Sequence, residues 1–195
     1  MYSKFSTQAI VLKKEETGEK DALLSLFTRE YGFIYAKVKG IQTQDSRLRF
    51  ALQPMTLCFV TLVHGKNNWI LTNATFIYSY YFETINSLQR RTIVQILHLI
   101  SRLYIGEQPH VVLFDFIENQ LKSISQKKLK DNQIKSFEVF IVFKLLDALG
   151  YIQEDKILAP IMSSDELNDS LANYIFENKK NITPFINLAI RTSGL

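Results

Sequence analysis

The residues with the clearest chemical potential alternate along the segment from Tyr31 to Lys39. If this segment is a strand, every second side chain lies on the same face. One face then carries three aromatic rings and two lysines, namely Tyr31, Phe33, Tyr35, Lys37 and Lys39. Aromatic rings stack on nucleic-acid bases and lysines neutralise phosphates, so the pattern is typical of a nucleic-acid-binding surface. The alternative is that the rings pack beneath a loop or helix while the lysines are only solvated.

Two further groups of basic residues extend this candidate surface. Arg47 and Arg49 follow in a segment expected to be a loop, where guanidinium groups favour a groove that binds phosphates. The second group surrounds a turn expected at Thr17–Glu19 and consists of Lys13, Lys14 and Lys20. Four acidic residues are interspersed with these lysines. A contact with phosphate and a solvated hairpin end therefore remain equally open for them.

Catalytic patterns are not evident. The sequence has no Gly-rich phosphate loop and no dinucleotide-binding glycine pattern. His64, His98 and His110 are scattered over different expected elements, so neither a metal site nor a catalytic triad is indicated. The single cysteine, Cys58, lies in an apolar run, which is typical of a buried and inert thiol. We therefore expect a protein that is not an enzyme and holds no metal or cofactor.

The charge is distributed unevenly along the chain. Residues 1–80 contain ten Lys or Arg and six acidic residues, whereas residues 81–195 contain thirteen of each. The whole net charge of +4 therefore belongs to the first part, which indicates a polyanionic partner for that part. The N-terminus has no signal-peptide pattern, and no apolar run approaches the roughly 18 residues of a membrane span. The expected location is cytoplasmic.

Short apolar runs separated by turn residues predict an N-terminal sheet. The expected strands are Ala9–Leu12, Leu23–Thr28, Phe33–Val38, Leu57–Val63 and Trp69–Tyr78. His64–Asn68 is a hairpin loop between the last two strands. Because closure removes exposed strand edges, five short strands favour a small barrel, and the OB-fold is the natural candidate for residues 1–80.

Helical periodicity predicts an all-helical domain over residues 84–195, and hence an α+β protein. A helix over 84–105 ends at Gly106, and Pro109 opens the next one. The segment Phe137–Leu149 is apolar nearly all round and belongs in the centre of a bundle, with Gly150 as its C-cap. Ser163 with Glu166 resembles a capping box, and Pro184 is expected to open a last short helix. The aromatic-rich run 76–82 is expected to be buried between barrel and helices.

The order and spacing of several motifs resemble the RecO family of DNA repair and recombination mediators. These motifs are Ala9-Ile10-Val11-Leu12, Gly18-Glu19-Lys20-Asp21, Leu26-Phe27-Thr28-Arg29-Glu30-Tyr31-Gly32, Ala36-Lys37-Val38-Lys39-Gly40, Ser46-Arg47-Leu48-Arg49 and Leu52-Gln53-Pro54. A weaker similarity to the family's central helix appears at Leu145-Leu146-Asp147-Ala148-Leu149-Gly150-Tyr151. The resemblance covers most of the chain and is strongest in its first third.

The resemblance implies an OB-fold barrel, a helical domain and no enzymatic activity. It implies binding of single- and double-stranded DNA, annealing of complementary strands, and assistance to RecA loading. The implied partners are RecR and the acidic C-terminal tail of the single-stranded-DNA-binding protein. Arg90, Arg91 and Arg102 are the candidate residues for that tail. Many family members carry a four-cysteine zinc module after the Leu-Gly-Tyr segment, whereas no cysteine follows Cys58 here.

Two other functions fit the residues. One is an OB-fold adaptor that binds protein or RNA rather than repair DNA. The other is a small enzyme with an unrecognised site. A DNA affinity that falls steeply with salt concentration would favour the mediator over both.

Overall fold

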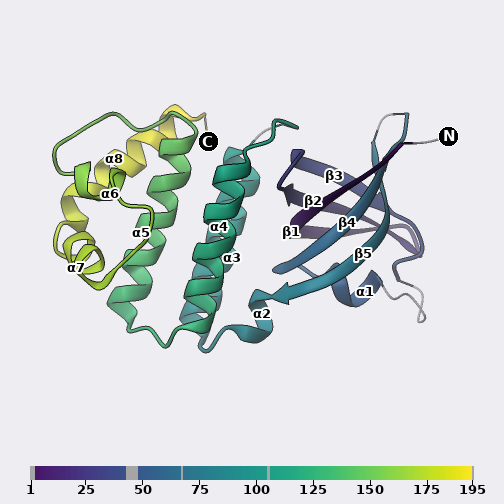
Figure 1. Ribbon diagram of the computed structural model, residues 1–195, viewed down its shortest axis with the longest axis horizontal. Helices are drawn as coiled ribbons and strands as arrows, with labels where there is room; N and C mark the ends of the chain where they lie inside the picture. The colour runs from purple at the N-terminus through teal and green to yellow at the C-terminus, as the bar shows by residue number, and fades with distance from the viewer. Residues whose placement is uncertain (1–2, 43–47, 67, 105, 195) are drawn as a thin grey trace. The chain divides into compact units, whose positions relative to one another are not determined.

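The computed structural model describes residues 3–42, 48–66, 68–104 and 106–194. The chain divides into two compact units. The first contains Met1–Glu83 together with Tyr104–Phe114, and the second contains Thr84–Leu103 together with Asp115–Leu195. Strands make up the first unit and helices the second (Figure 1), which confirms the predicted fold class of a barrel followed by helices.

The five strands of the first unit form a closed barrel in the order β1-β2-β3-β5-β4. Their bounds are β1 Lys4–Thr17, β2 Asp21–Thr28, β3 Gly32–Val38, β4 Thr56–His64 and β5 Trp69–Ser79. Neighbouring strands are antiparallel except β3 and β5, which pair in parallel over three residues from Trp69 to Leu71. The short helix α1, Leu48–Ala51, lies between β3 and β4 in the sequence. This strand order is that of an OB-fold barrel.

The barrel interior is filled by alternate side chains of all five strands. Small and branched residues dominate this cluster, which includes Ala9, Val11, Leu24, Leu26, Ile34, Ala36, Val38, Cys58, Val60, Leu62 and Leu71. Aromatic rings are added by Phe5 and Trp69, whose centroids lie 5.4 Å apart with the planes nearly perpendicular. The period-2 pattern of the sequence therefore produces the interior directly.

One outer row of the barrel is covered by the segment Tyr104–Phe114, which returns to the first unit after a long helix. Phe27 is fully buried, and its ring centroid lies 5.3 Å from that of Tyr104 and 5.2 Å from that of Phe114. Phe33 pairs with Phe27 across the sheet and donates its backbone N–H to Gly106 O at 3.1 Å. The segment is thus built into the barrel unit by both packing and backbone hydrogen bonds.

The remaining helices are α2 Tyr80–Glu83, α3 Ser87–Leu103, α4 Val111–Gln126, α5 Asp131–Ala148, α6 Ala159–Met162, α7 Asp169–Glu177 and α8 Lys179–Thr192. Within the second unit, α5 packs against α3, α6, α7 and α8. Its side chains are buried on nearly every side, which confirms the prediction of a central helix. Gly150, at φ +79°, follows its C-cap, and Tyr151 N–H closes the last turn on Leu146 O at 2.9 Å.

Two predicted helix starts, at Ser163 and at Pro184, are wrong. Helix α7 begins at Asp169, because Asn168 Oδ1 accepts the Leu171 N–H at 2.8 Å, whereas Ser163 is the C-cap of α6. Helix α8 begins at Lys179, so Pro184 lies inside it, and the Thr183 hydroxyl bonds Lys179 O at 2.7 Å in the preceding turn. Helix α5 begins at Asp131, where Gln133 Oε1 accepts the Lys130 N–H at 3.0 Å.

Helix α4 begins at Val111, two residues after Pro109. His110 caps it, since its Nδ1 accepts the Leu113 N–H at 3.2 Å. None of the helices in the described part of the chain is long and apolar enough to cross a membrane.

Candidate nucleic-acid interface

The outer face of β3 presents one aromatic ring rather than the three predicted. Tyr35 is 53% exposed, and Lys37 and Lys39 are exposed beside it along the chain. Phe33 is only 7% exposed, because it lies in the row of outward-facing side chains that the segment Tyr104–Phe114 covers. The centroids of the Phe33 and Tyr35 rings lie 5.0 Å apart, with the ring planes perpendicular. The predicted surface therefore retains Tyr35 with the lysines that follow it.

Tyr31 was predicted on this face and lies elsewhere. The strand begins at Gly32, whose φ of +66° turns the chain, so the alternation does not extend back to Tyr31. The Tyr31 ring packs instead against the interior cluster, 5.8 Å from Phe5 and 5.5 Å from Trp69 between centroids. It contributes to the barrel core and not to an exposed stacking surface.

Strand register brings Lys13 to the same surface as Tyr35. Ser25 on β2 pairs with Lys13 on β1 and with Tyr35 on β3, so these three side chains form one row across the sheet. The next row consists of Glu15, Leu23 and Lys37. Directly paired residues share a face. The outer surface of β1–β2–β3 therefore joins Lys13, Tyr35 and Lys37.

Lys14 points to the opposite face of the sheet. It pairs with Leu24, which pairs with Ala36, and both of these belong to the barrel interior. An irregularity in β1 between Val11 and Lys13 sets this register. The three lysines predicted around the first turn are thus divided: Lys13 joins the candidate surface, Lys14 does not, and Lys20 is exposed in the turn itself.

Carboxylates neutralise part of this surface. Lys13 forms an ion pair with Glu15, and the hydrogen bond and charge of that carboxylate raise the pKa of Lys13. Lys37 Nζ lies 3.5 Å from Asp21 Oδ2. The Gly40 N–H, which donates to Asp21 Oδ1 at 3.1 Å, lowers the pKa of Asp21, and Lys37 and Lys39 lower it further. Asp21 therefore stays ionised and competes with any phosphate for Lys37.

Of the two arginines of the predicted patch, the structure describes only Arg49. Arg49 lies on α1, which packs against β5 and β4, and its side chain is exposed. The predicted loop is a short helix at this position. Arg47 lies outside the described residues. The structure thus assembles Lys13, Tyr35 and Lys37 from the predicted set, with Lys39 close enough to act on Asp21.

The arginines predicted for partner binding all lie on α3. Arg91 and Arg102 are exposed, whereas Arg90 is half-buried and donates from Nη2 to Thr84 O at 3.4 Å. Arg91 and Arg102 are eleven residues apart, which brings them to the same side of the helix roughly 17 Å apart. Arg90 faces a different direction from Arg91, about 100° around the helix.

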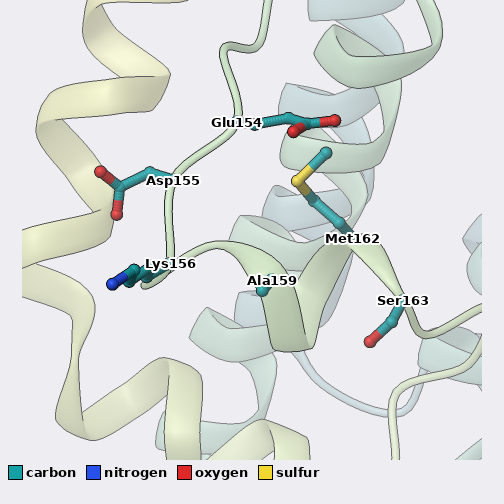
Figure 2. A pocket seen from close by; sticks show the side chains of 6 residues that line it. All are labelled: Glu154, Asp155, Lys156, Ala159, Met162 and Ser163. Atoms are coloured by element: carbon teal, nitrogen blue, oxygen red, sulfur yellow. The ribbon is translucent and has the colours of Figure 1, made fainter.

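Elsewhere in the described part of the chain, we find no cluster of side chains that could bind a metal. Within the described residues no three potential metal ligands among His, Cys, Asp and Glu come together. Cys58 is buried in the barrel, and burial raises its pKa to about 12, so its thiol is unreactive at neutral pH. An open pocket of about 630 Å³ lies in the second unit. Figure 2 shows the residues that line it, Glu154, Asp155, Lys156, Ala159, Met162 and Ser163. Asp155 Oδ1 there accepts the Ile157 N–H at 2.9 Å, which stabilises a local turn.

Sequence reasoning missed an aromatic pair on the first unit. Phe50 on α1 and Phe76 on β5 are 57% and 39% exposed, and their ring centroids lie 4.9 Å apart. Within the run 76–82, Tyr80 is buried, whereas Phe76, Ile77, Tyr81 and Phe82 are exposed. The absence of any acidic residue from position 46 to position 82 was the signal available in the sequence.

Comparison with known proteins supports the reading of the barrel. Residues 1–80 match the family model described as recombination protein O N terminal. A protein named DNA repair protein RecO from Caldanaerobacter subterraneus subsp. tengcongensis is 28% identical over 148 residues, which are 75% of this chain and 58% of the relative. Proteins of the same name from Heliobacterium modesticaldum and Gloeothece citriformis are 43% identical over 70 residues and 31% identical over 128 residues.

These two alignments cover 36% and 65% of this chain, and 26% and 45% of the respective relatives. The chain therefore spans somewhat more than half the length of the relatives that it matches most extensively. The resemblance seen in the sequence is confirmed for the barrel: residues 1–80 are similar to the recombination protein O N-terminal domain, and the relatives that match the chain are named DNA repair protein RecO.

Proposed function

We propose that this chain binds DNA through its barrel and acts as a recombination mediator in DNA repair, without catalysing a reaction itself. The relatives are named DNA repair proteins, which supports a role in that process. The observation that carries the proposal is the row across β1–β2–β3, where exposed Tyr35 lies between lysines on one surface of an OB-fold barrel. OB-folds use this face for oligonucleotides.

The proposed mode of binding is to the backbone rather than to base edges. Lys13, Lys37 and Lys39 would neutralise phosphates, while Tyr35 would stack on an unpaired base. Such contacts carry no sequence information, so single and double strands of any sequence would bind. Because neutralised phosphates repel a second strand less, the same surface would favour annealing of complementary strands.

The proposed partners are RecR and the acidic tail of the single-stranded-DNA-binding protein, and the resulting complex would assist RecA loading. For the tail, the exposed pair Arg91 and Arg102 on α3 is the best candidate, because both arginines lie on one side of the helix. Arginine recognises carboxylates through two parallel hydrogen bonds, which suits an acidic peptide ending in a free carboxylate.

A strand-annealing assay tests this function. Two complementary labelled oligonucleotides are mixed with the chain, with and without single-stranded-DNA-binding protein, and duplex formation is followed by energy transfer. We expect faster annealing with the chain than without it, together with an affinity that falls steeply as salt increases. A chain that bound RNA or protein but neither form of DNA would be an adaptor, and the mediator function would be excluded.

A further inference from the structure

We propose that Phe50, Phe76 and Arg49 form a second binding surface, which takes a single strand of nucleic acid by stacking its unpaired bases. This inference rests on the proposed function, since it adds a site for the same class of ligand on the same barrel unit. It differs from the β1–β2–β3 surface in its residues, its elements and its local charge.

Two phenylalanine rings come together here from elements distant in sequence. Phe50 lies on α1, and α1 packs beside β5 (Figure 1), where it meets Phe76. The rings are inclined by 44° to each other, so they do not cover each other face to face. Both keep a large exposed fraction, 57% for Phe50 and 39% for Phe76. Exposed rings in this arrangement offer stacking area to bases.

Strand pairing places Phe76 beyond the short contact of β5 with β3. Among the described residues, β5 pairs with β3 only from Trp69 to Leu71, and beyond Leu71 it pairs with β4 alone. Phe76 pairs with Cys58 of the interior face, whereas Phe59 on β4 pairs with Thr75 on the opposite face of the sheet. The rings of Phe50 and Phe76 therefore lie together where β5 has left β3, on the face opposite to Phe59.

The charged residues in the sequence around this aromatic pair favour an anionic ligand. The stretch from position 46 to position 82 contains three basic residues and no acidic residue, whereas residues 1–45 contain all six acids of the first 80. Arg49 adjoins Phe50, is exposed, and has no carboxylate within ion-pair distance in the described part of the chain. Lys13 and Lys37, by contrast, each have a carboxylate partner. Among the described residues, a phosphate at Arg49 would therefore meet no such competitor.

The aromatic pair distinguishes a single strand from a duplex. In a duplex the base faces are already stacked on one another, so exposed rings gain nothing from them, whereas unpaired bases can stack on any aromatic face. Arginine next to aromatic rings completes the combination used by proteins that bind single strands without sequence preference. Two separate surfaces on one barrel would also let the chain hold two strands at once, as annealing requires.

The test compares binding of a fluorescent thymine oligonucleotide and a duplex of equal length, by anisotropy at several salt concentrations. For the Phe50→Ala/Phe76→Ala variant we expect about a tenfold loss of affinity for the single strand and little change for the duplex. For Arg49→Ala we expect the slope of log affinity against log salt to flatten by about 0.7. Phe59→Ala is the matched control, since Phe59 is 45% exposed on the opposite face and should have no effect.

Thermal unfolding of each variant checks that it is folded. If the double variant is not folded, the single variant Phe50→Ala is measured in its place. Phe50→Trp should retain single-strand affinity, since a larger ring still stacks. If wild type binds the strand and the Phe50 and Phe76 variants bind it equally well, the second surface is refuted while the proposed function stands. Equal losses on strand and duplex would refute it as well. A variant that keeps its affinity but sediments as a smaller species would assign the rings to self-association. If wild type binds no DNA, both proposals fail.

Discussion

Trp69 donates its indole N–H to Glu107 Oε1 at 3.0 Å, which joins β5 to the segment Tyr104–Phe114 across 38 residues of sequence. The same segment accepts the Phe33 N–H at Gly106 O. Its Tyr104 and Phe114 rings cover Phe27. The barrel unit therefore depends on residues that follow the first long helix, and the chain must return to the barrel before that outer row is shielded from water.

The closest approach of this segment to the barrel occurs at Gly32. A Cβ added there would lie 2.4 Å from Gln108 O, and the φ of +66° is itself unfavourable for a side chain. We expect Gly32→Ala to lower the free energy of unfolding by about 2 kcal/mol or more, in urea denaturation. Gly18→Ala is the control, because Gly18 has φ +69° but nothing within 4 Å. An equal loss for both variants would show that only backbone strain matters.

In the second unit, Gln89 on α3 caps the C-terminal end of α4, which is distant in sequence. This residue is fully buried on α3, and its Nε2 donates to Ile124 O at 2.6 Å and Lys127 O at 2.8 Å at the end of α4. Gln89→Ala leaves both carbonyls without this donor, so we expect unfolding to become easier by about 2 kcal/mol. The control is Gln95→Ala, at an exposed position of the same helix. Similar unfolding midpoints for the two variants would contradict the capping role.

Asp21 should make stability depend on pH in the acid range. Its folded-state pKa is lowered, mainly by the Gly40 N–H. The stability contributed by its ionised form is therefore complete above the unfolded value of about 3.9 and is lost as pH falls through the folded-state pKa. Asp21→Asn should be less stable than wild type near neutral pH, and the two should converge in strong acid. A difference that stayed constant at every pH would mean that charge is not its cause.

Lys37 on β3 and Lys39 directly after it should determine the salt dependence of DNA binding. If Lys37 and Lys39 both contact phosphate, the double alanine variant should flatten the slope of log affinity against log salt by about 1.4 for a single strand. Lys14→Ala is the matched control, because Lys14 lies on the opposite face in the row with Leu24. An unchanged slope in the double variant would place the DNA elsewhere on the barrel.

Two variants near these lysines separate charge from stacking. Tyr35→Ala should cost roughly 1–3 kcal/mol of binding if a base stacks there, with little change in the slope. Asp21→Asn should raise the affinity for DNA, because it releases Lys37 from its carboxylate partner. Fluorescence anisotropy at several salt concentrations measures both effects. A lower affinity for Asp21→Asn would show that the carboxylate orients the surface rather than competing with phosphate.

The arginines of α3 should act in partner binding and not in DNA binding. An Arg90→Ala/Arg91→Ala/Arg102→Ala variant should bind a labelled tail peptide of the single-stranded-DNA-binding protein at least about tenfold more weakly. Its DNA affinity should stay near that of wild type. Arg191→Ala, at an exposed position near the end of α8, controls for loss of charge alone. Tail binding that survives the triple substitution would rule out these residues as the site.

The sequence by itself determined the strands and the interior of the barrel. Short apolar runs separated by turn residues predicted all five strands, because the face of a strand that points into a barrel must be apolar. The nearly all-apolar α5 was identified as a central helix for a similar local reason. The motifs of the first third were enough to indicate a resemblance to the RecO family, which the match of residues 1–80 confirms.

Only the tertiary structure decided which candidate residues meet. A positive φ at Gly32 turns Tyr31 into the core, and a packed distant segment buries Phe33. Strand alternation places Lys13 and Lys14 on opposite faces, and the irregularity between Val11 and Lys13 decides that Lys13 is the one that faces outward. Phe50 and Phe76 are 26 positions apart and meet only because α1 packs on β5. Periodicity records which face of an element is apolar, but register, bulges and long-range packing determine which side chains share a surface.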